Sequence, residues 1–535
     1  EAARLFDGLT RKSQDLANLS LGSVEPGHEE EHRRRLALLS DEVEQAERSL
    51  AAASREFRRD LDGQTRTPAD LQKALPANAV LVDFVEYKHF TPPTEKVKLR
   101  RWEPHLAAFL VRREKPLEQV ELGPVAPIER AIQSWRRKFV PLATDELPDL
   151  SVPRTADDDQ DPGRRLRELI WDKLQSRLTG APVVLISPDR ATARFPWPAM
   201  PGKEPGTYLV EETAVAVVPI PRLLAELGHD KPAGAGASAA KDSAPEQSLL
   251  LVGDVNYDAN PGRASAGTIA QSAPRGTRAG QLLHWPPLDG TRTEMATIAD
   301  SFEQQFPDGR LDKLRGDRAT KAALIGKISD HRYVHLATHG FFAPKELKSA
   351  LGVAMGAENR GAGGATSLRD VAGYPPGLLS GVVLAGANRP AAEGNDDGIL
   401  TALEVSQLDL RRVDLATLSA CETGLGESAG GEGVLGLQRA LQIAGAKSVV
   451  ATLWRISDDA SRALMSDFYD NLWNRKMTKL EALRQAQLKM LRTGANRGLA
   501  GVSRGLKFAN DQPPDSNHRL PPYYWAPFVL SGDWQ

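Results

Sequence analysis

The sequence predicts an α/β fold built on a mostly parallel sheet with helices on both faces. Short runs of aliphatic and β-branched residues recur along the chain, and helical patterns fill most of the gaps between them. Strands that alternate with helices are typical of parallel sheets, because a connection between parallel strands needs room for a crossover. The runs are apolar throughout, as expected for strands buried on both faces.

The first expected strands lie in the N-terminal half of the chain, at residues 79–85, 106–111, 183–186 and 214–218. Helical patterns near residues 128–139 and 163–178 lie between them. This alternation predicts a companion α/β region over residues 76–230. The region contains no cysteine, so it cannot supply a thiol nucleophile.

Further strands are expected in the C-terminal half, at residues 249–254, 333–338, 381–384, 413–418 and 448–453. They predict a second and better-defined α/β domain over residues 282–535. Residues 231–281, which surround the first of these strands, are rich in Gly, Ala, Ser and Pro. Such a composition is typical of flexible linkers.

The chain begins with a segment of helical pattern, residues 1–75. Its apolar side chains are three and four residues apart, at Leu36, Leu39, Val43, Ala46 and Leu50. This spacing predicts an amphipathic helix. Two interpretations fit: the end of an upstream helical repeat or partner-binding module, or a helix folded back on the body. Because the chain starts at Glu1 and its first methionine is Met200, we expect a piece of a longer protein.

Composition excludes several classes of protein. The 68 basic and 70 acidic residues give a net charge of −2, which offers no general attraction to nucleic acid or membranes. No apolar run approaches the roughly 20 residues that span a bilayer, and no signal peptide opens the chain, so we expect a cytoplasmic protein. The single cysteine excludes an intrachain disulfide and a multi-cysteine zinc site. We expect neither a metal nor a cofactor.

Two of the expected strands lead into reactive side chains. His339 directly follows residues 333–338, and Cys421 follows residues 413–418 after a gap of two residues. Carboxyl ends of parallel strands open on the same edge of a sheet, so an imidazole and a thiol can meet there. The imidazole can take the thiol proton and later protonate a leaving amine. Backbone N–H groups of Gly340 and Cys421 are candidates for an oxyanion hole.

Structural explanations compete with this chemistry. A lone cysteine at a strand end is often a small buried hydrophobic residue, and the histidines can be core or turn residues. His331, His335 and His339 have a spacing that suits zinc binding on a helix. On a strand, however, four residues span roughly 13 Å, which is too far for the imidazoles to share one metal.

Several motifs resemble the CHAT domain, a family related to caspases and separases in which many members carry upstream tetratricopeptide repeats. They are residues 338–340, 419–424, 433–437, 451–454 and 522–532. The resemblance extends over roughly residues 78–535. It implies a caspase-like sheet flanked by helices, with residues 76–230 as an inactive, pseudo-protease-like companion.

The resemblance also implies roles for individual residues. His339 corresponds to the general base and acid, Cys421 to the nucleophile, and Gly340 with the Cys421 amide to the oxyanion hole. His335 has no role in the family and is interpreted as a packing residue. The separation of His339 and Cys421 (421 − 339 = 82 residues) exceeds the roughly 50 residues of caspases. Residues 359–366 and 393–398 account for an insertion, as substrate-facing loops or as exposed turns.

Asp458 resembles the separase aspartate that receives an arginine at the P1 position of the substrate. A carboxylate matches a guanidinium group through two parallel hydrogen bonds. A structural interpretation also fits, because Ser457 is a good N-cap and Asp458 and Asp459 suit the first turn of a helix. The two interpretations are compatible.

The resemblance therefore implies a cysteine endopeptidase that cleaves a protein substrate, after a basic residue, through a thioester. The family context suggests regulated bacterial proteolysis in defence, stress or cell-death signalling, with an activating protein bound through the N-terminal helical region. The alternative is a catalytically silent or latent scaffold. Self-processing is a third possibility, because Arg275 and Arg278 lie in an expected linker.

Overall fold

The computed structural model describes most of the chain from Thr67 onward and four isolated helical residues before it. The described ranges are 67–92, 101–140, 161–224, 247–260, 277–278, 281–282, 284–342, 380–389, 397–419, 432–454, 456–493 and 519–535, with the isolated residues 35, 38, 42 and 45. Several predicted features lie outside the described residues: Cys421, Arg275, the segment 359–366 and the apolar stripe of Leu36, Leu39, Val43, Ala46 and Leu50.

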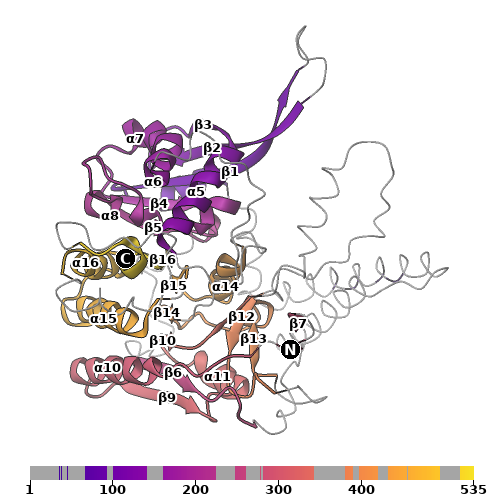
Figure 1. The fold of residues 1–535 in the computed structure, drawn as a ribbon, viewed down its shortest axis with the longest axis vertical. Coiled ribbons are helices and arrows are strands. Elements are labelled where there is room, and N and C mark those ends of the chain that lie inside the picture. The colour runs from indigo at the N-terminus through magenta and orange to yellow at the C-terminus, as the bar shows by residue number, and fades with distance from the viewer. Residues whose placement is uncertain are drawn as a thin grey trace, which may run out of the picture.

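An 11-stranded sheet runs through the described part of the chain (Figure 1), in the order β3-β2-β1-β4-β5-β16-β15-β14-β10-β6-β9. The N-terminal half contributes β1 (Ala79–Thr91), β2 (Arg101–Val111), β3 (Glu118–Pro124), β4 (Val183–Ser187) and β5 (Ala214–Val217). The C-terminal half contributes β6 (Ser248–Val255), β9 (Arg310–Gly316), β10 (Tyr333–Leu336), β14 (Leu415–Leu418), β15 (Ser448–Thr452) and β16 (Phe528–Gly532).

The sheet is mostly parallel, but its two halves run in opposite directions. Strands β1, β4, β5 and β16 are mutually parallel, and β16 is antiparallel to β15. Strands β15, β14, β10, β6 and β9 are parallel to one another. The last strand of the chain thus joins the halves, and the carboxyl ends of β6, β10, β14 and β15 share one edge of the sheet.

Helices cover both faces of the C-terminal half, as predicted (Figure 1). Along β6 the side chains alternate between two cores: Leu249 and Leu251 belong to the core that contains α10 and α15, and Leu250 faces the core of α11 and α14. A strand buried on both faces needs apolar residues at every position, which explains its uninterrupted apolar pattern.

The longer helices are α5 (Val125–Phe139), α10 (Gly290–Gln305), α11 (Lys321–Ile328), α14 (Glu432–Ile443), α15 (Asp458–Tyr469) and α16 (Lys479–Thr493). The shorter ones are α4 (Pro68–Ala74), α6 (Pro162–Leu166), α7 (Asp172–Leu178), α8 (Leu209–Glu212), α13 (Ala402–Val405) and α17 (Pro522–Trp525). The helix expected at residues 163–178 corresponds to α6 and α7, joined by a π-helical turn at Arg167–Trp171.

One expected strand belongs to a different sheet. Residues 381–384 correspond to β12 (Ser380–Val383), which pairs antiparallel with β11 (Gly340–Phe342) and β13 (Ile399–Thr401) in a separate three-stranded sheet. The apolar pattern predicts that a strand is buried but does not identify its neighbours. A short hairpin of β7 (Thr277–Arg278) and β8 (Gln281–Leu282) lies in the expected linker region.

Candidate active site at the carboxyl edge of the sheet

The strands that lead to His339 and Cys421 are direct neighbours. In the parallel pairing of β10 with β14, Leu336 lies opposite Leu418. The Ser419 N–H donates to the Leu336 carbonyl at 2.9 Å, which extends the ladder by one residue. His339 follows Leu336 by three residues, and Cys421 follows Leu418 by the same number. The described ends of the two strands therefore lie at the same edge of the sheet and in the same register.

The His339 side chain is held in a defined orientation. Only 1% of the residue is exposed. Its Nε2 lies 2.7 Å from the Pro286 carbonyl oxygen, and its ring centroid lies 5.0 Å from that of Tyr257. A carbonyl oxygen can only accept a hydrogen bond, so Nε2 carries a proton. The neutral ring then has its lone pair on Nδ1, the nitrogen that a general base would use.

A second layer of contacts supports this strand end. The Tyr257 hydroxyl oxygen lies 2.9 Å from that of Thr338, and the Thr338 O–H group donates to the Val383 carbonyl at 2.5 Å. Tyr257 is 2% exposed, although it lies in a segment whose composition predicts a linker. Its position two residues after β6, at the same carboxyl edge, is the sequence signal that could have identified it.

Gly340 begins β11, the outer strand of the three-stranded sheet. The Val383 N–H donates to the His339 carbonyl at 2.9 Å, which makes His339 and Val383 a hydrogen-bonded pair. Such pairs alternate with non-hydrogen-bonded pairs in antiparallel sheets, so the next pair, Gly340 and Val382, is of the second kind. The Gly340 N–H is therefore directed away from β12.

Asp458 is the first residue of α15 and is exposed to solvent. Its Oδ2 accepts a hydrogen bond from the Gly290 N–H, the first residue of α10, at 3.0 Å. Ser457 caps α15 by accepting from Ala460 N, as predicted. The segment 286–290 thus contacts the His339 ring at one end and the Asp458 carboxylate at the other.

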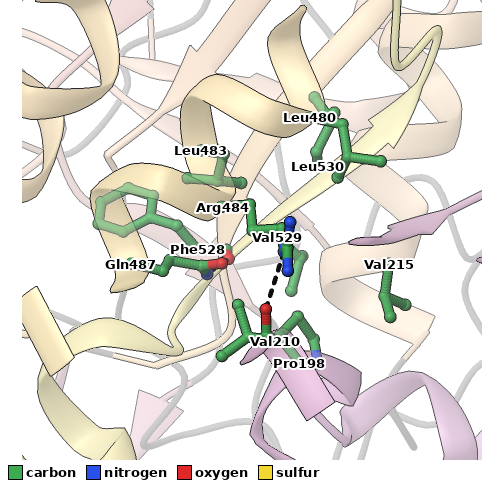
Figure 2. A pocket seen from close by; sticks show the side chains of 10 residues that line it. All are labelled: Pro198, Val210, Val215, Leu480, Leu483, Arg484, Gln487, Phe528, Val529 and Leu530. Atoms are coloured by element: carbon green, nitrogen blue, oxygen red, sulfur yellow. Dashed lines mark hydrogen bonds between the residues drawn. The ribbon is translucent and has the colours of Figure 1, made fainter. Parts of the chain in front are cut away.

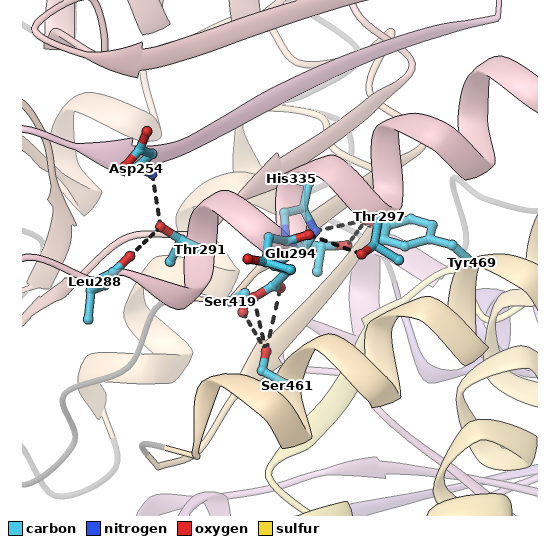
Figure 3. A network of polar contacts seen from close by, with 11 residues as sticks. Asp254, Leu288, Thr291, Glu294, Thr297, His335, Ser419, Ser461 and Tyr469 are labelled. Atoms are coloured by element: carbon cyan, nitrogen blue, oxygen red, sulfur yellow. Dashed lines mark hydrogen bonds and ion pairs between the residues drawn. The ribbon is translucent and has the colours of Figure 1, made fainter.

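His335 lies in a buried polar network rather than in apolar packing alone (Figure 3). Its Nε2 is 3.0 Å from Glu294 Oε1, and its Nδ1 is 3.0 Å from the Tyr469 hydroxyl. Burial raises the pKa of that tyrosine. His331 has other partners, the Lys327 carbonyl and Asp312. In the described part of the chain, no three His, Cys, Asp or Glu residues are grouped to hold a metal ion.

The acidic loop at residues 393–398 ends in a buried charge cluster. The Lys321 Nζ lies 3.2 Å from Asp397 Oδ1 and 2.6 Å from Glu404 Oε1. Burial opposes the charge on Lys321, but the two carboxylates outweigh it and raise the pKa of the lysine. Asp397 and Gly398 are buried, so the described end of this loop is not an exposed turn. The cluster connects α11 with α13 and with the segment that leads into β13.

A small cavity lies between the two halves of the sheet (Figure 2). Its lining includes Pro198, Val210 and Val215 from the N-terminal half and Leu483, Gln487 and Val529 from the C-terminal half. The Arg484 Nε donates to the Val210 carbonyl across this seam at 2.8 Å. The lining is largely apolar and includes none of His339, Gly340 or Asp458, so the cavity is a packing feature.

Comparison with known families decides what the chain is. The family model of the CHAT domain matches residues 160–533, which is more than half of the sequence. The chain belongs to the CHAT domain family. This confirms the predicted family, although the match begins at residue 160 rather than near residue 78. The mostly parallel sheet with its flanking helices confirms the predicted α/β fold class. No curated protein sequence matches this CHAT chain.

The solved structures that are similar to the CHAT chain include gingipain and separase. Gingipain R (RGPB), an Arg-specific cysteine proteinase, has a TM-score of 0.35 and 9% identity, over 76% of this chain and 74% of its own. Separase of Saccharomyces cerevisiae, in complex with securin, has a TM-score of 0.40 and 9% identity, over 87% of this chain and 30% of its own. In the described parts of the chain, no helix is long and apolar enough to cross a membrane.

Proposed function

We propose that this CHAT protein is a cysteine endopeptidase in which His339 and Cys421 form the catalytic pair. The observation that carries the proposal is the register of β10 and β14. Leu336 and Leu418 lie opposite each other, and the two candidate residues follow them at equal distance along the chain. The family assignment supports the same pair.

The geometry around His339 suits the chemistry. Because the Pro286 carbonyl accepts from Nε2, the neutral imidazole presents its lone pair at Nδ1. Nδ1 takes the proton of the Cys421 thiol, and the thiolate attacks the scissile carbonyl carbon. The imidazolium then protonates the leaving amine, which leaves a thioester. Water hydrolyses the thioester, and His339 serves as the base for that step.

The Gly340 N–H is a suitable donor for the negative charge that develops on the substrate oxygen. It is directed away from β12 and belongs to the outer strand of its sheet, so it is not used in the pairing of that sheet. Together with the Cys421 N–H it would form a two-donor oxyanion hole.

Asp458 is proposed as the acceptor for a basic P1 side chain. Its exposure and its place after β15, the neighbour of β14, support this role. Oδ2 is occupied by the Gly290 N–H, and a bound guanidinium group would reach Oδ1. The contact with Gly290 also fixes the carboxylate relative to the segment that holds His339.

The near-complete burial of His339 favours a peptidase that is latent until a partner acts on it. A substrate reaches the imidazole only after a rearrangement of the surrounding chain, and such rearrangements commonly control enzymes. We assign this activation to a protein bound through residues 1–75, in regulated bacterial proteolysis. A catalytically silent scaffold is the competing function.

A panel of fluorogenic peptides that differ at P1 tests the proposal. Cleavage after Arg or Lys is expected with the wild-type chain, and none with Cys421→Ala or His339→Ala. Circular dichroism checks that both variants keep their fold. Hydrolysis that survives in Cys421→Ala would remove the catalytic pair. Absence of hydrolysis in the wild type, even after limited proteolysis to release latency, would favour the scaffold.

A further inference from the structure

The network around His335 extends to Ser419, which precedes the proposed nucleophile by two residues in the sequence (Figure 3). We call it the Glu294 network; its members are Glu294, His335, Thr417, Ser419, Ser461 and Tyr469. They come from α10, β10, α15 and β14 with the residue that follows it, segments far apart in the sequence. Glu294 and Ser461 are 3% and 4% exposed, and His335 is fully buried. Buried polar groups are kept only where they are hydrogen-bonded.

The donors and acceptors of the network can be assigned in order. The Tyr469 hydroxyl donates to Thr417 Oγ1 at 2.9 Å, so its oxygen accepts from His335 Nδ1–H. One proton then lies between His335 Nε2 and Glu294 Oε1, which are 3.0 Å apart. The histidine and the glutamate are therefore either both charged or both neutral. In each case the buried pair carries no net charge, which makes its burial tolerable.

Ser461 connects this pair to the strand that precedes Cys421. Its hydroxyl donates to the two Glu294 carboxylate oxygens at 3.4 and 3.3 Å, and its oxygen lies 2.9 Å from the Ser419 hydroxyl. Ser419 is also tied to β10 through the bond from its N–H to Leu336. Both the backbone and the side chain of Ser419 are thus held, two residues before Cys421.

The helices that carry Glu294 and Ser461 are themselves locked together one turn earlier. The Gly290 N–H donates to Asp458, and a Cβ at Gly290 would lie 2.2 Å from the Asp458 Cβ. A side chain at position 290 would therefore force α10 and α15 or the Asp458 side chain to shift. Ser461 follows Asp458 by three residues on the same helix, so one rigid unit carries both side chains.

We propose that Ser461, held by Glu294, is a positioning residue that fixes Ser419 and thereby orients the Cys421 thiol for attack. The inference rests on the proposed function, because it takes Cys421 as the nucleophile. Displacements of about 1 Å at a reacting group cost about a hundredfold in rate, so loss of one hydrogen bond to Ser419 is enough to be measured.

The test uses the fact that Cys421 is the only cysteine in the chain. The rate of its reaction with a chromogenic disulfide, followed across pH, reports on that thiol without any peptide substrate. We expect Ser461→Ala to slow this reaction roughly tenfold and to lower kcat more than it changes KM. Ser461→Thr keeps a hydroxyl and should restore most of the rate.

Two further comparisons separate positioning from stability. Ser448→Ala is the matched control. Ser448 is fully buried and donates to the Asp533 carbonyl at 2.6 Å, but it is the first residue of β15 and so lies at the end of the strand away from the carboxyl edge. It should leave the thiol rate unchanged. Glu294→Gln preserves the shape of the network, since an amide can accept from Ser461 and donate to neutral His335. It should therefore react far more like the wild type than Glu294→Ala.

Equal thiol rates in Ser461→Ala and Ser448→Ala would overturn the inference. The two assays distinguish a failure of the peptidase proposal from a failure of the positioning role of Ser461. If the wild type cleaves no peptide but Ser461→Ala slows the thiol reaction, the positioning role stands and the peptidase proposal fails. If cleavage depends on Cys421 while Ser461→Ala matches the control in both assays, the positioning role alone is wrong.

Discussion

The Lys321 cluster allows a prediction about stability and its dependence on pH. Lys321→Met removes the only cation among three buried charges and leaves the carboxylates of Asp397 and Glu404 facing each other. The three side chains are 3%, 6% and 7% exposed, so water compensates little for the lost partner. Methionine is close to lysine in length and fills the space without adding strain.

The burial of these three side chains sets the expected loss in the free energy of unfolding of Lys321→Met. Breaking a buried ion pair by removing one partner costs about 3–5 kcal/mol, because an uncompensated charge remains. Lys479→Met is the matched control. Lys479 also contacts two carboxylates, but Asp414 and Asp533 are 19% and 22% exposed, and Asp414 keeps Arg332 as a partner. The control should cost roughly 1–2 kcal/mol, because solvent reaches its carboxylates.

The protonation of Glu404 determines how the stability deficit of Lys321→Met changes with pH. Burial raises the pKa of Glu404 above its ordinary value of 4.5, against the opposing effects of Lys321 and Thr401. Removing Lys321 raises that pKa further. When the pKa of a carboxyl group is higher in the folded than in the unfolded state, the folded state loses stability as the pH rises above the unfolded-state pKa. The deficit of Lys321→Met should therefore be small at about pH 5 and large at about pH 7.5.

Urea unfolding followed by far-UV circular dichroism at the two pH values measures this effect. Wild type, Lys321→Met and Lys479→Met are compared at equal protein concentration. A deficit that is equal at both pH values, or no larger than that of the control, would refute the assignment of a buried and mutually dependent charge cluster.

Further changes test other parts of the structure. Asp458→Asn should lower kcat/KM for arginine substrates while the melting temperature stays close to that of the wild type; an unchanged preference for arginine would place the P1 pocket elsewhere. Gly290→Ala should destabilise the fold by about 1–3 kcal/mol, because its Cβ meets the Asp458 side chain; a melting curve identical to that of the wild type would contradict the close approach of α10 and α15. Removal of residues 1–66, which keeps α4 and the fully buried Leu75 in place, should change activation but leave the thiol reactivity of Cys421 intact; a folded fragment with an unreactive thiol would argue against a purely regulatory N-terminal segment.

Much of the sheet could be predicted from local sequence. The apolar runs at residues 183–186, 249–254 and 448–453 correspond closely to β4, β6 and β15. A strand buried on both faces has a pattern that no exposed segment shares, so its position is readable without its neighbours. By contrast, β9 was missed, because its sequence Arg310–Gly316 is largely charged, as befits the edge strand of a sheet.

Only part of the candidate site could be predicted from the sequence. His339, Gly340 and Cys421 follow strand patterns and belong to motifs, and the structure brings the β10 and β14 strand ends together as the prediction requires. The side chains that support the two strand ends carry no such local signal. Tyr257 lies in a glycine-rich region, and Glu294 looks like any acidic residue on an amphipathic helix.

The sequence by itself determined most of the buried strands and the family to which the chain belongs, and it supplied the residues proposed to carry the chemistry, because these depend on local pattern. Only the tertiary structure decided the contacts between distant segments. The carbonyl of Pro286 orients His339, and the carboxylate of Asp458 accepts a hydrogen bond from the Gly290 N–H. The last strand, β16, joins two halves of the sheet that run in opposite directions. Such contacts depend on how helices and strands pack in space, and residues that meet there can be more than a hundred positions apart in the chain.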